Sequence, residues 1–248
     1  IGVLLNVSKS IPGLHRPQVL AIAADARDRS PLRRKCHISP EQQGILQLSD
    51  TCLSGSDDQR RIVVFGDSHG AEISYALSGH MTAQRLQVRH VTASGCPPAL
   101  GVTPLLQKQC AIHVEKMMSG LMAAPPSLVI VTSHYFQWAA QSSSVREPFW
   151  RGLDQVVAKL RSAGHDVLLL GGVPPHHFSN LPHALAKHVK AGHAAQSYTF
   201  PIDLNLSDAI DTKLKAIAQQ HSATYIPLLP TVCGDDRVCM GSAHGNAI

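Results

Sequence analysis

Short apolar runs alternate with longer stretches of helical periodicity along most of the chain. Residues 62–65 are apolar and largely β-branched and end at Gly66, which is typical of a buried strand. Four similar runs predict further strands, at residues 88–92, 128–132, 166–170 and 223–226. The segments between these strands predict helices over residues 71–85, 105–122, 145–163 and 207–221, with Ser207 as the N-cap of the last. Strands that alternate with helices of this length predict an α/β fold, with a parallel sheet covered on both faces.

Residues 1–60 have a different sequence pattern, with scattered Pro and Gly, a basic cluster and two cysteines. We expect them to form an irregular extension, with one short helix near residues 18–27, that packs on a domain spanning residues 61–248. No apolar run approaches the roughly 18 to 20 residues that a membrane-spanning helix needs. The chain begins at Ile1 without a signal peptide and ends at Ile248 without a tail, so we expect an excised domain or a fragment.

Composition narrows the class of protein. The chain has 248 residues, enough for one domain with a sizeable core, and its 44% of apolar and 16% of charged residues exclude wholesale disorder. Aromatic residues make up only 4%, which argues against a stacking platform for single-stranded nucleic acid. The net charge of +5 comes from mostly dispersed basic residues, a pattern that suits an acidic polymer and is not a nucleic-acid footprint.

The six cysteines fall into three neighbouring pairs along the chain. Six cysteines allow many connectivities, and the sequence alone does not choose among them. None forms the Cys-x-x-Cys spacing of a zinc site. We favour three local disulfides, Cys36–Cys52, Cys96–Cys110 and Cys233–Cys239, which imply an oxidising compartment. The alternative is six buried cytosolic thiols.

The sequence Gly66-Asp67-Ser68-His69-Gly70 follows the first predicted strand and opens the next helix. This places Ser68 at the carboxyl edge of the sheet, where the functional crevices of parallel sheets lie. It also places Ser68 at a helix N-terminus, where backbone N–H groups favour an oxyanion. Two interpretations stay open at this point: a nucleophilic serine, and a serine that only caps the helix.

Residues 62–74, IVVFGDSHGAEIS, resemble the first sequence block of the SGNH (GDSL-like) hydrolase superfamily. They are most similar to the version found as the periplasmic domain of acyltransferase-3 membrane proteins, which O-acetylate bacterial surface polysaccharides. Residues 92–100, TASGCPPAL, resemble that family's Cys-Pro-Pro segment, and residues 34–37, RKCH, resemble its cysteine-bearing extension. The segment from Cys233 to Cys239 resembles its small cysteine loop. The resemblance covers about residue 30 to the end.

The resemblance implies a flavodoxin-like SGNH three-layer sandwich with about five parallel strands. It implies that Ser68 is the nucleophile and that the backbone N–H groups of Ser68 and Gly95 form the oxyanion hole. Ser94 or the turn backbone are alternatives to Gly95. The candidates for the pocket are Asp67, His69, Ser133 and His134. Neither a metal nor an organic cofactor is implied.

Two features depart from the family pattern. The residues after the third predicted strand, Ser133-His134-Tyr135-Phe136, lack the superfamily's usual Asn. No Asp-x-x-His block follows Cys239, and the residue three positions before the late histidine His244 is Gly241. Either His244 is the catalytic base without its usual Asp, or the block lies beyond Ile248. We favour the second interpretation, because the chain stops where that block is expected.

By resemblance, the chain is an O-acyltransferase domain that passes an acyl group, expected to be acetyl, through a Ser68 ester. The acceptor is expected to be a sugar hydroxyl of a bacterial surface polysaccharide or lipid-linked glycan such as lipopolysaccharide, and no nucleic-acid partner is expected. The expected donor is a fused or associated multi-helix membrane acyltransferase domain, which places the chain on the periplasmic side of the inner membrane.

Three alternatives remain: a serine esterase of the same fold, a catalytically incomplete glycan-binding module, and a metallophosphoesterase. The metallophosphoesterase is disfavoured, because such enzymes need further sequence blocks to hold two metal ions. The segments Gly234-Asp235-Asp236 and His244-Gly245-Asn246 lack the residues that complete these blocks.

Histidines are abundant, 15 in all, and five lie after the fourth predicted strand: His176, His177, His183, His188 and His193. The last three recur at every fifth residue, which does not align them on one helix face. We expect a solvated histidine-rich loop here, with a metal site as the alternative. Partial protonation below neutral pH would help such a loop to bind an acidic saccharide.

Overall fold

The computed structural model describes residues 30–55, 60–81, 86–105, 107–173, 181–200, 203–233, 239–240, 242–243 and 246–247, together with Pro17, Val19 and Ile22. The chain divides into two compact units. The larger unit comprises Arg29–Val173 and Asp203–Leu229, and the smaller unit comprises the remaining segments. Each unit is described separately below.

The larger unit is built on one sheet of six strands. They are β1 (Leu53–Ser54), β2 (Arg60–Gly66), β3 (Leu86–Thr92), β4 (Leu128–Thr132), β5 (Asp166–Leu170) and β7 (Thr224–Ile226). Their order is β1-β3-β2-β4-β5-β7. Five of them pair in parallel, namely β3, β2, β4, β5 and β7, which confirms the predicted parallel sheet. Strand β1 adds an antiparallel edge beside β3.

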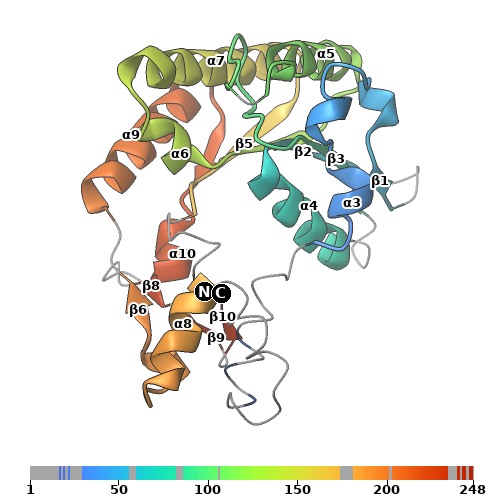
Figure 1. The fold of residues 1–248 in the computed structure, drawn as a ribbon. Helices are drawn as coiled ribbons and strands as arrows, with labels where there is room; N and C mark the ends of the chain where they lie inside the picture. Colours follow the sequence, from blue (N-terminus) through green and yellow to red (C-terminus); the bar gives the residue numbers. More distant parts are fainter. Residues whose placement is uncertain are drawn as a thin grey trace. The chain divides into compact units, whose positions relative to one another are not determined.

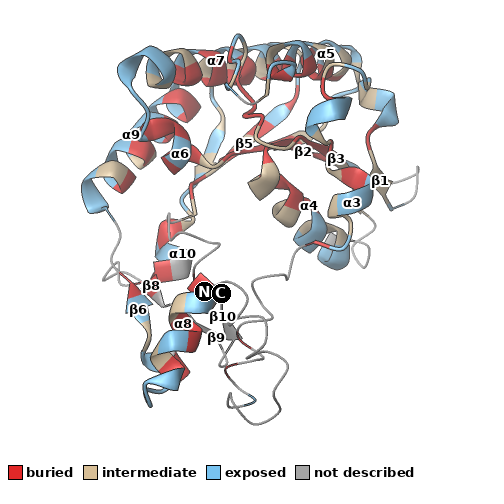
Figure 2. Ribbon diagram, in the orientation of Figure 1, coloured by how far each residue is buried: buried red, intermediate tan, exposed pale blue. Residues whose placement is uncertain are grey.

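Helices cover both faces of this sheet (Figure 1). One face is covered by α4 (Ser68–Met81), and the other by α5 (Cys110–Ala123), α7 (Ser143–Ser162) and α9 (Leu204–Gln220). The side chains of β2 alternate between the two faces, as the period of a strand requires. Ile62 and Val64 pack on the α4 side, whereas Val63 and Phe65 join the main core cluster. Buried residues accordingly concentrate on the sheet and on the helix faces that meet it (Figure 2).

Two helix starts differ from the sequence-based expectation. Helix α5 begins at Cys110, and not at residue 105, because the chain between Cys96 and Cys110 forms turns closed by a disulfide. Helix α9 begins at Leu204, so the prediction of Ser207 as its N-cap was wrong. Ser207 is buried inside the helix, and the cap is Asp203, whose carboxylate accepts the Leu206 N–H at 3.0 Å.

The described part of the N-terminal extension is more regular than expected. Residues 30–54 contain helix α3 (Arg33–Cys36), the short 3-10 helices η1 (Pro40–Gln42) and η2 (Leu48–Asp50), and strand β1. The Cys36–Cys52 disulfide ties the two ends of this stretch together. Leu48 packs against Gly120 of α5, where a Cβ would lie 2.6 Å from the Leu48 Cβ. The extension is therefore part of the larger unit's packing.

The smaller unit contains helix α8 (Leu181–Lys190), the 3-10 turn η4 (Ala195–Ser197) and two short antiparallel pairs. The pairs are β6 (Thr199–Phe200) with β8 (Cys239–Met240), and β9 (Ser242–Ala243) with β10 (Asn246–Ala247). Helix α10 (Leu229–Cys233) begins at the end of the larger unit. Of the predicted helix at residues 18–27, only Val19 and Ile22 lie within the described residues, and both are helical.

The expectation of a histidine-rich loop was wrong for residues 181–190, which are helical. Leu185, Ala186 and Val189 form an apolar face that packs on Val19 and Ile22, and this burial stabilises a helix. His183 is exposed, and the rings of His188 and His193 stack with centroids 4.7 Å apart. His176 and His177 lie outside the described residues.

The buried histidines His90 and His113 of the larger unit predict acid sensitivity. His113 is 1% exposed and its ring nitrogens have no hydrogen-bond partner in the described part of the chain, and His90 is 2% exposed. Burial lowers the pKa of each to about 4. The unfolded chain therefore binds protons below about pH 6.5 that the folded chain does not bind until about pH 4.

The free energy of unfolding is thus expected to fall between about pH 6.5 and about pH 4, by about 1.4 kcal/mol per pH unit for each of these histidines. Urea unfolding at a series of pH values measures this slope. His113→Leu should make the slope shallower by the contribution of one histidine. An unchanged slope in that variant would show that His113 does not carry this linkage.

Candidate active site

The candidate site lies at the carboxyl edge of the parallel sheet, around its first strand in sequence. Strand β2 is central, with β3 on one side and β4 on the other, so the strand order reverses there. Such a reversal opens a crevice in α/β sheets. The turn after β2 supplies Asp67, Ser68 and His69, the loop after β3 supplies Gly95, and the loop after β4 supplies Ser133 and His134. The structure therefore brings the predicted residues from these three loops to one edge.

Asp67 links the turn after β2 to the loop after β4. It is 3% exposed, and its Oδ1 accepts the His69 N–H at 2.9 Å. Its Oδ2 accepts the Ser133 hydroxyl at 2.7 Å and the His134 N–H at 2.8 Å. Asp67 therefore caps helix α4 and holds two loops together, and the buried Ser133 hydroxyl is committed to that task.

Ser68 is the first residue of α4 and is half-buried. Within the described part of the chain, neither its hydroxyl nor its backbone N–H has a hydrogen-bond partner. The N-terminus of this 14-residue helix favours negative charge at that point. Because Asp67 already caps the helix, the interpretation of Ser68 as a structural cap loses its support.

Two glycines allow the loops to approach closely. A Cβ on Gly66 would lie 2.3 Å from the Thr132 carbonyl oxygen, so only glycine permits this contact between β2 and β4. Gly95 has φ +59°, in the left-handed region that favours glycine. Its N–H donates to no group that the structure describes. Ser68 and Gly95 thus each present a backbone donor without a described acceptor at the same edge of the sheet.

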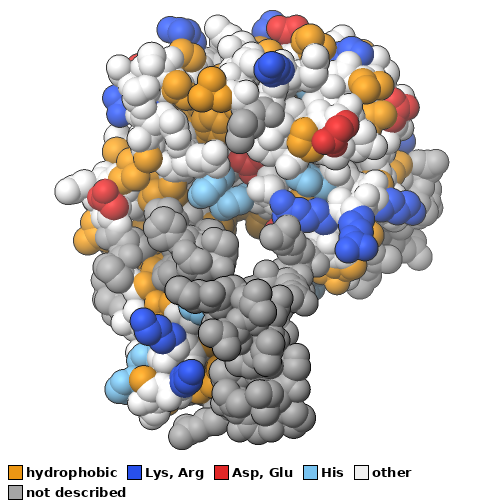
Figure 3. Space-filling model, in the orientation of Figure 1, with side chains coloured by type: hydrophobic (Ala, Val, Ile, Leu, Met, Phe, Trp, Pro, Cys, Tyr) orange, Lys and Arg blue, Asp and Glu red, His pale blue; other side chains and the backbone are white. Residues whose placement is uncertain are grey.

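His69 and His134 form a stacked pair beside Ser68. Their ring centroids lie 4.4 Å apart with an interplanar angle of 19°. Burial lowers the pKa of His69, and the neighbouring His134 and Arg33 act in the same direction against the Asp67 carboxylate, which raises it. His134 Nδ1 lies 3.1 Å from the Gln137 Oε1, within hydrogen-bond distance. Histidine and basic side chains lie close together on the face shown in Figure 3.

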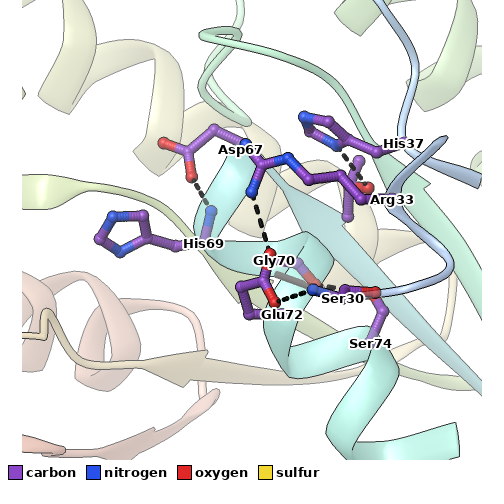
Figure 4. Close-up of polar contacts among 9 residues, drawn as sticks. Ser30, Arg33, His37, Asp67, His69, Gly70, Glu72 and Ser74 are labelled. Carbon is purple, nitrogen blue, oxygen red and sulfur yellow. Dashed lines mark hydrogen bonds and ion pairs between the residues drawn. The ribbon is translucent and has the colours of Figure 1, made fainter. Parts of the chain in front are cut away.

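The extension reaches the site through helix α3 (Figure 4). Glu72 of α4 accepts the Arg33 guanidinium at 2.9 Å and the Ser30 N–H at 2.8 Å. His37 Nδ1 lies 3.0 Å from the Thr92 hydroxyl. Burial, and then Arg33, lower the pKa of His37 to about 4. The Arg33–Glu72 ion pair thus fastens α3 to α4, and His37, which follows α3, contacts the end of β3.

Sequence reasoning missed four residues at this edge: Arg33, His37, Gln43 and Glu72. Arg33, His37 and Gln43 lie in the extension around Cys36, whose disulfide with Cys52 holds the extension in place, and Glu72 lies within residues 62–74. The other two predicted disulfides, Cys96–Cys110 and Cys233–Cys239, are also present, and no described cysteine is free. His244 lies outside the described residues, so its position relative to Ser68 stays a prediction.

Other features of the described residues lie away from Ser68 or concern other chemistry. Cavities of about 340 and 360 Å³ occur, one lined by residues of α7 and α9 and one around Arg61 and Arg89, and Ser68 lines neither. Within the described ranges, no three His, Cys, Asp or Glu side chains are grouped as a metal site would require. None of the described helices is long and apolar enough to cross a membrane.

Comparison with known proteins identifies the family. The family model for the SGNH domain (fused to AT3 domains) matches residues 35–248. The periplasmic domain of a Salmonella ser. Paratyphi A lipopolysaccharide acetyltransferase aligns with TM-score 0.66 and 16% identity, over 91% of this chain and 85% of that chain. A crystal structure of TesA aligns with TM-score 0.44 and 17% identity, over 71% of this chain and 82% of that chain. No curated protein matches the chain. The predicted fold and resemblance are confirmed: the chain belongs to the family of SGNH domains fused to AT3 domains.

Proposed function

We propose that this chain transfers an acetyl group through Ser68 to a sugar hydroxyl of a bacterial surface polysaccharide. The observation that carries the proposal is the Ser68 hydroxyl, without a described partner at the N-terminus of α4, in a chain of this family. The Salmonella neighbour is the periplasmic domain of a lipopolysaccharide acetyltransferase, which supports lipopolysaccharide or a related lipid-linked glycan as the acceptor.

The reaction has two halves, and both pass through the same oxyanion hole. In the first half, Ser68 Oγ attacks the acetyl carbonyl, its proton passes to a base, and the donor's leaving group takes up a proton as its bond to the acetyl carbon breaks. In the second half, the sugar oxygen attacks the Ser68 ester, its proton passes to the base, and Ser68 recovers a proton. The N–H groups of Ser68 and Gly95 stabilise the oxyanion that forms each time.

The base in this proposal is a histidine of the C-terminal segment, for which His244 is the candidate within the chain. His69 and His134 take a different part and line the pocket beside Ser68. Burial keeps His69 neutral. In this proposal the backbone N–H donors, and not a charged histidine, therefore stabilise the negative charge of the oxyanion. No metal or organic cofactor takes part in either half of the reaction.

The proposed location and donor follow from the family and the disulfides. Three disulfides are typical of an oxidising compartment, which supports the periplasm. The family's fusion to AT3 domains supports a membrane acyltransferase as the source of the acetyl group. The net charge of +5 suits an acidic surface glycan.

The test uses the full-length protein, 4-nitrophenyl acetate as donor and de-O-acetylated lipopolysaccharide as acceptor. We expect a peptide containing Ser68 to gain one acetyl group, detected by mass spectrometry, and the acceptor to gain O-acetyl groups, detected by NMR. Release of acetate alone at saturating acceptor would make the protein an esterase. Absence of an acetyl group on Ser68 would remove the proposed nucleophile.

A further inference from the structure

The N-terminal extension forms hydrogen bonds with the loop that carries Gly95. The Ile38 N–H donates to the Thr92 carbonyl at 2.9 Å, and the Ser94 N–H donates to the Ile38 carbonyl at 2.9 Å. Ile38 and Ala93 form an isolated parallel bridge. One rung of sheet pairing therefore joins the extension to the loop after β3, between two segments each closed by a disulfide.

The side chain of Gln43 also contacts this loop, at the peptide group between Ser94 and Gly95. It is 1% exposed, and its Nε2 donates to the Ser94 carbonyl oxygen at 2.7 Å. The Ser94 carbonyl and the Gly95 N–H belong to the same planar, trans peptide group. Holding the carbonyl oxygen therefore fixes the direction in which the Gly95 N–H points.

Without such a hold, this peptide has freedom to turn over. A peptide flip changes ψ of Ser94 and φ of Gly95 together, and glycine tolerates both resulting conformations. The flipped form would point a carbonyl oxygen at the site in place of the N–H, which repels an oxyanion. The hydrogen bond from Gln43 also polarises the peptide, which strengthens its N–H as a donor.

Stability alone does not account for an amide at this position. The Gln43 Oε1 is buried and has no hydrogen-bond partner in the described part of the chain. A buried acceptor without a partner costs free energy that an apolar side chain of the same size would avoid. The donor end of the amide, which reaches Ser94, is the end with a partner.

We propose that Gln43 is a positioning residue, which holds the Ser94–Gly95 peptide with its N–H directed at the oxyanion formed on Ser68. The inference rests on the proposed function, because it takes Gly95 as an oxyanion donor. It extends the active site into the N-terminal extension.

The test compares Gln43→Met with the matched control Gln42→Met in the full-length protein. Gln42 is the neighbouring, exposed glutamine, and its Oε1 accepts the Ser39 N–H at 3.1 Å, away from the loop that carries Gly95. With 4-nitrophenyl acetate, we expect kcat of Gln43→Met to fall about 100-fold, since one oxyanion donor is worth at least that much. KM and the melting temperature should stay at the wild-type values, and Gln42→Met should match the wild type throughout. An unchanged kcat in Gln43→Met would overturn the inference.

A second variant decides the matter if Gln43→Met fails to fold. A glutamic acid at position 43 donates to the Ser94 oxygen only when protonated, and burial raises its pKa towards neutral. We expect the kcat of Gln43→Glu, divided by the wild-type kcat at the same pH, to rise as the pH falls from about 8 to about 6. A flat ratio would overturn the inference. Retained activity in Ser68→Ala would instead overturn the proposed function, whatever the Gln43 variants show.

Discussion

Replacing Ser68 by alanine is expected to lower acetyl transfer by about four to six orders of magnitude, because the variant lacks the atom that carries the acetyl group. The fold should survive, since Ser68 Oγ has no described partner and Asp67, rather than Ser68, caps helix α4. Alanine also has a high helix propensity and is therefore compatible with the first turn of α4. The measurements are the initial rate of transfer to de-O-acetylated lipopolysaccharide and the melting temperature of the same preparation.

The matched control for this variant is Ser74→Ala in the same helix. Ser74 is buried and its hydroxyl donates to the Gly70 carbonyl at 2.7 Å, so the same substitution there removes only a local contact. We expect Ser74→Ala to keep the transfer rate within a few-fold of the wild type. Substantial transfer by Ser68→Ala would mean that another group carries the acetyl.

The second large effect is expected for Asp67→Asn. The carboxylate accepts from three donors, and an amide in its place has only one oxygen. In one orientation the amide nitrogen faces the His69 N–H, and in the other it faces the His134 N–H. Either way a partly buried backbone donor loses its acceptor, so we expect the free energy of unfolding to fall by about 1–3 kcal/mol. Activity should fall as well, because the turn with Ser68 is no longer joined to the loop after β4.

Urea unfolding of Asp67→Asn measures this loss. Asp166→Asn is the control, because Asp166 is exposed and its ion pair with Arg161 lies at the surface. Surface pairs of this kind contribute about 0–1 kcal/mol. Equal stability of the two variants would show that the three contacts of Asp67 do not hold the loops together.

The parallel sheet and the turn with Ser68 were predictable because they depend on residues close in sequence. The apolar run before Gly66 and the glycines of the turn are local signals of a strand, a tight turn and a helix start. The edge of the sheet that carries Ser68, Gly95 and His134 follows from the fact that all parallel strands end on one side.

The extension's part in the site was not predictable, because its contacts are made far along the chain. Gln43 meets Ser94 51 residues later, and Arg33 meets Glu72 39 residues later. A glutamine among Pro, Gly and polar residues carries no pattern that marks it as buried. The start of α9 was missed for a related reason, since both Asp203 and Ser207 are good capping residues and only packing places Ser207 inside the helix.

The two edges of the main sheet bear on how copies of the domain behave when crowded together. One edge is the two-residue strand β1, which runs antiparallel to its neighbour, and the other is the three-residue strand β7. Long, flat edges invite strands from other molecules and lead to aggregation, whereas very short edges offer few free backbone groups for such pairing. Two edge strands this short therefore limit edge-to-edge association, which favours separate domains when many copies share a confined space.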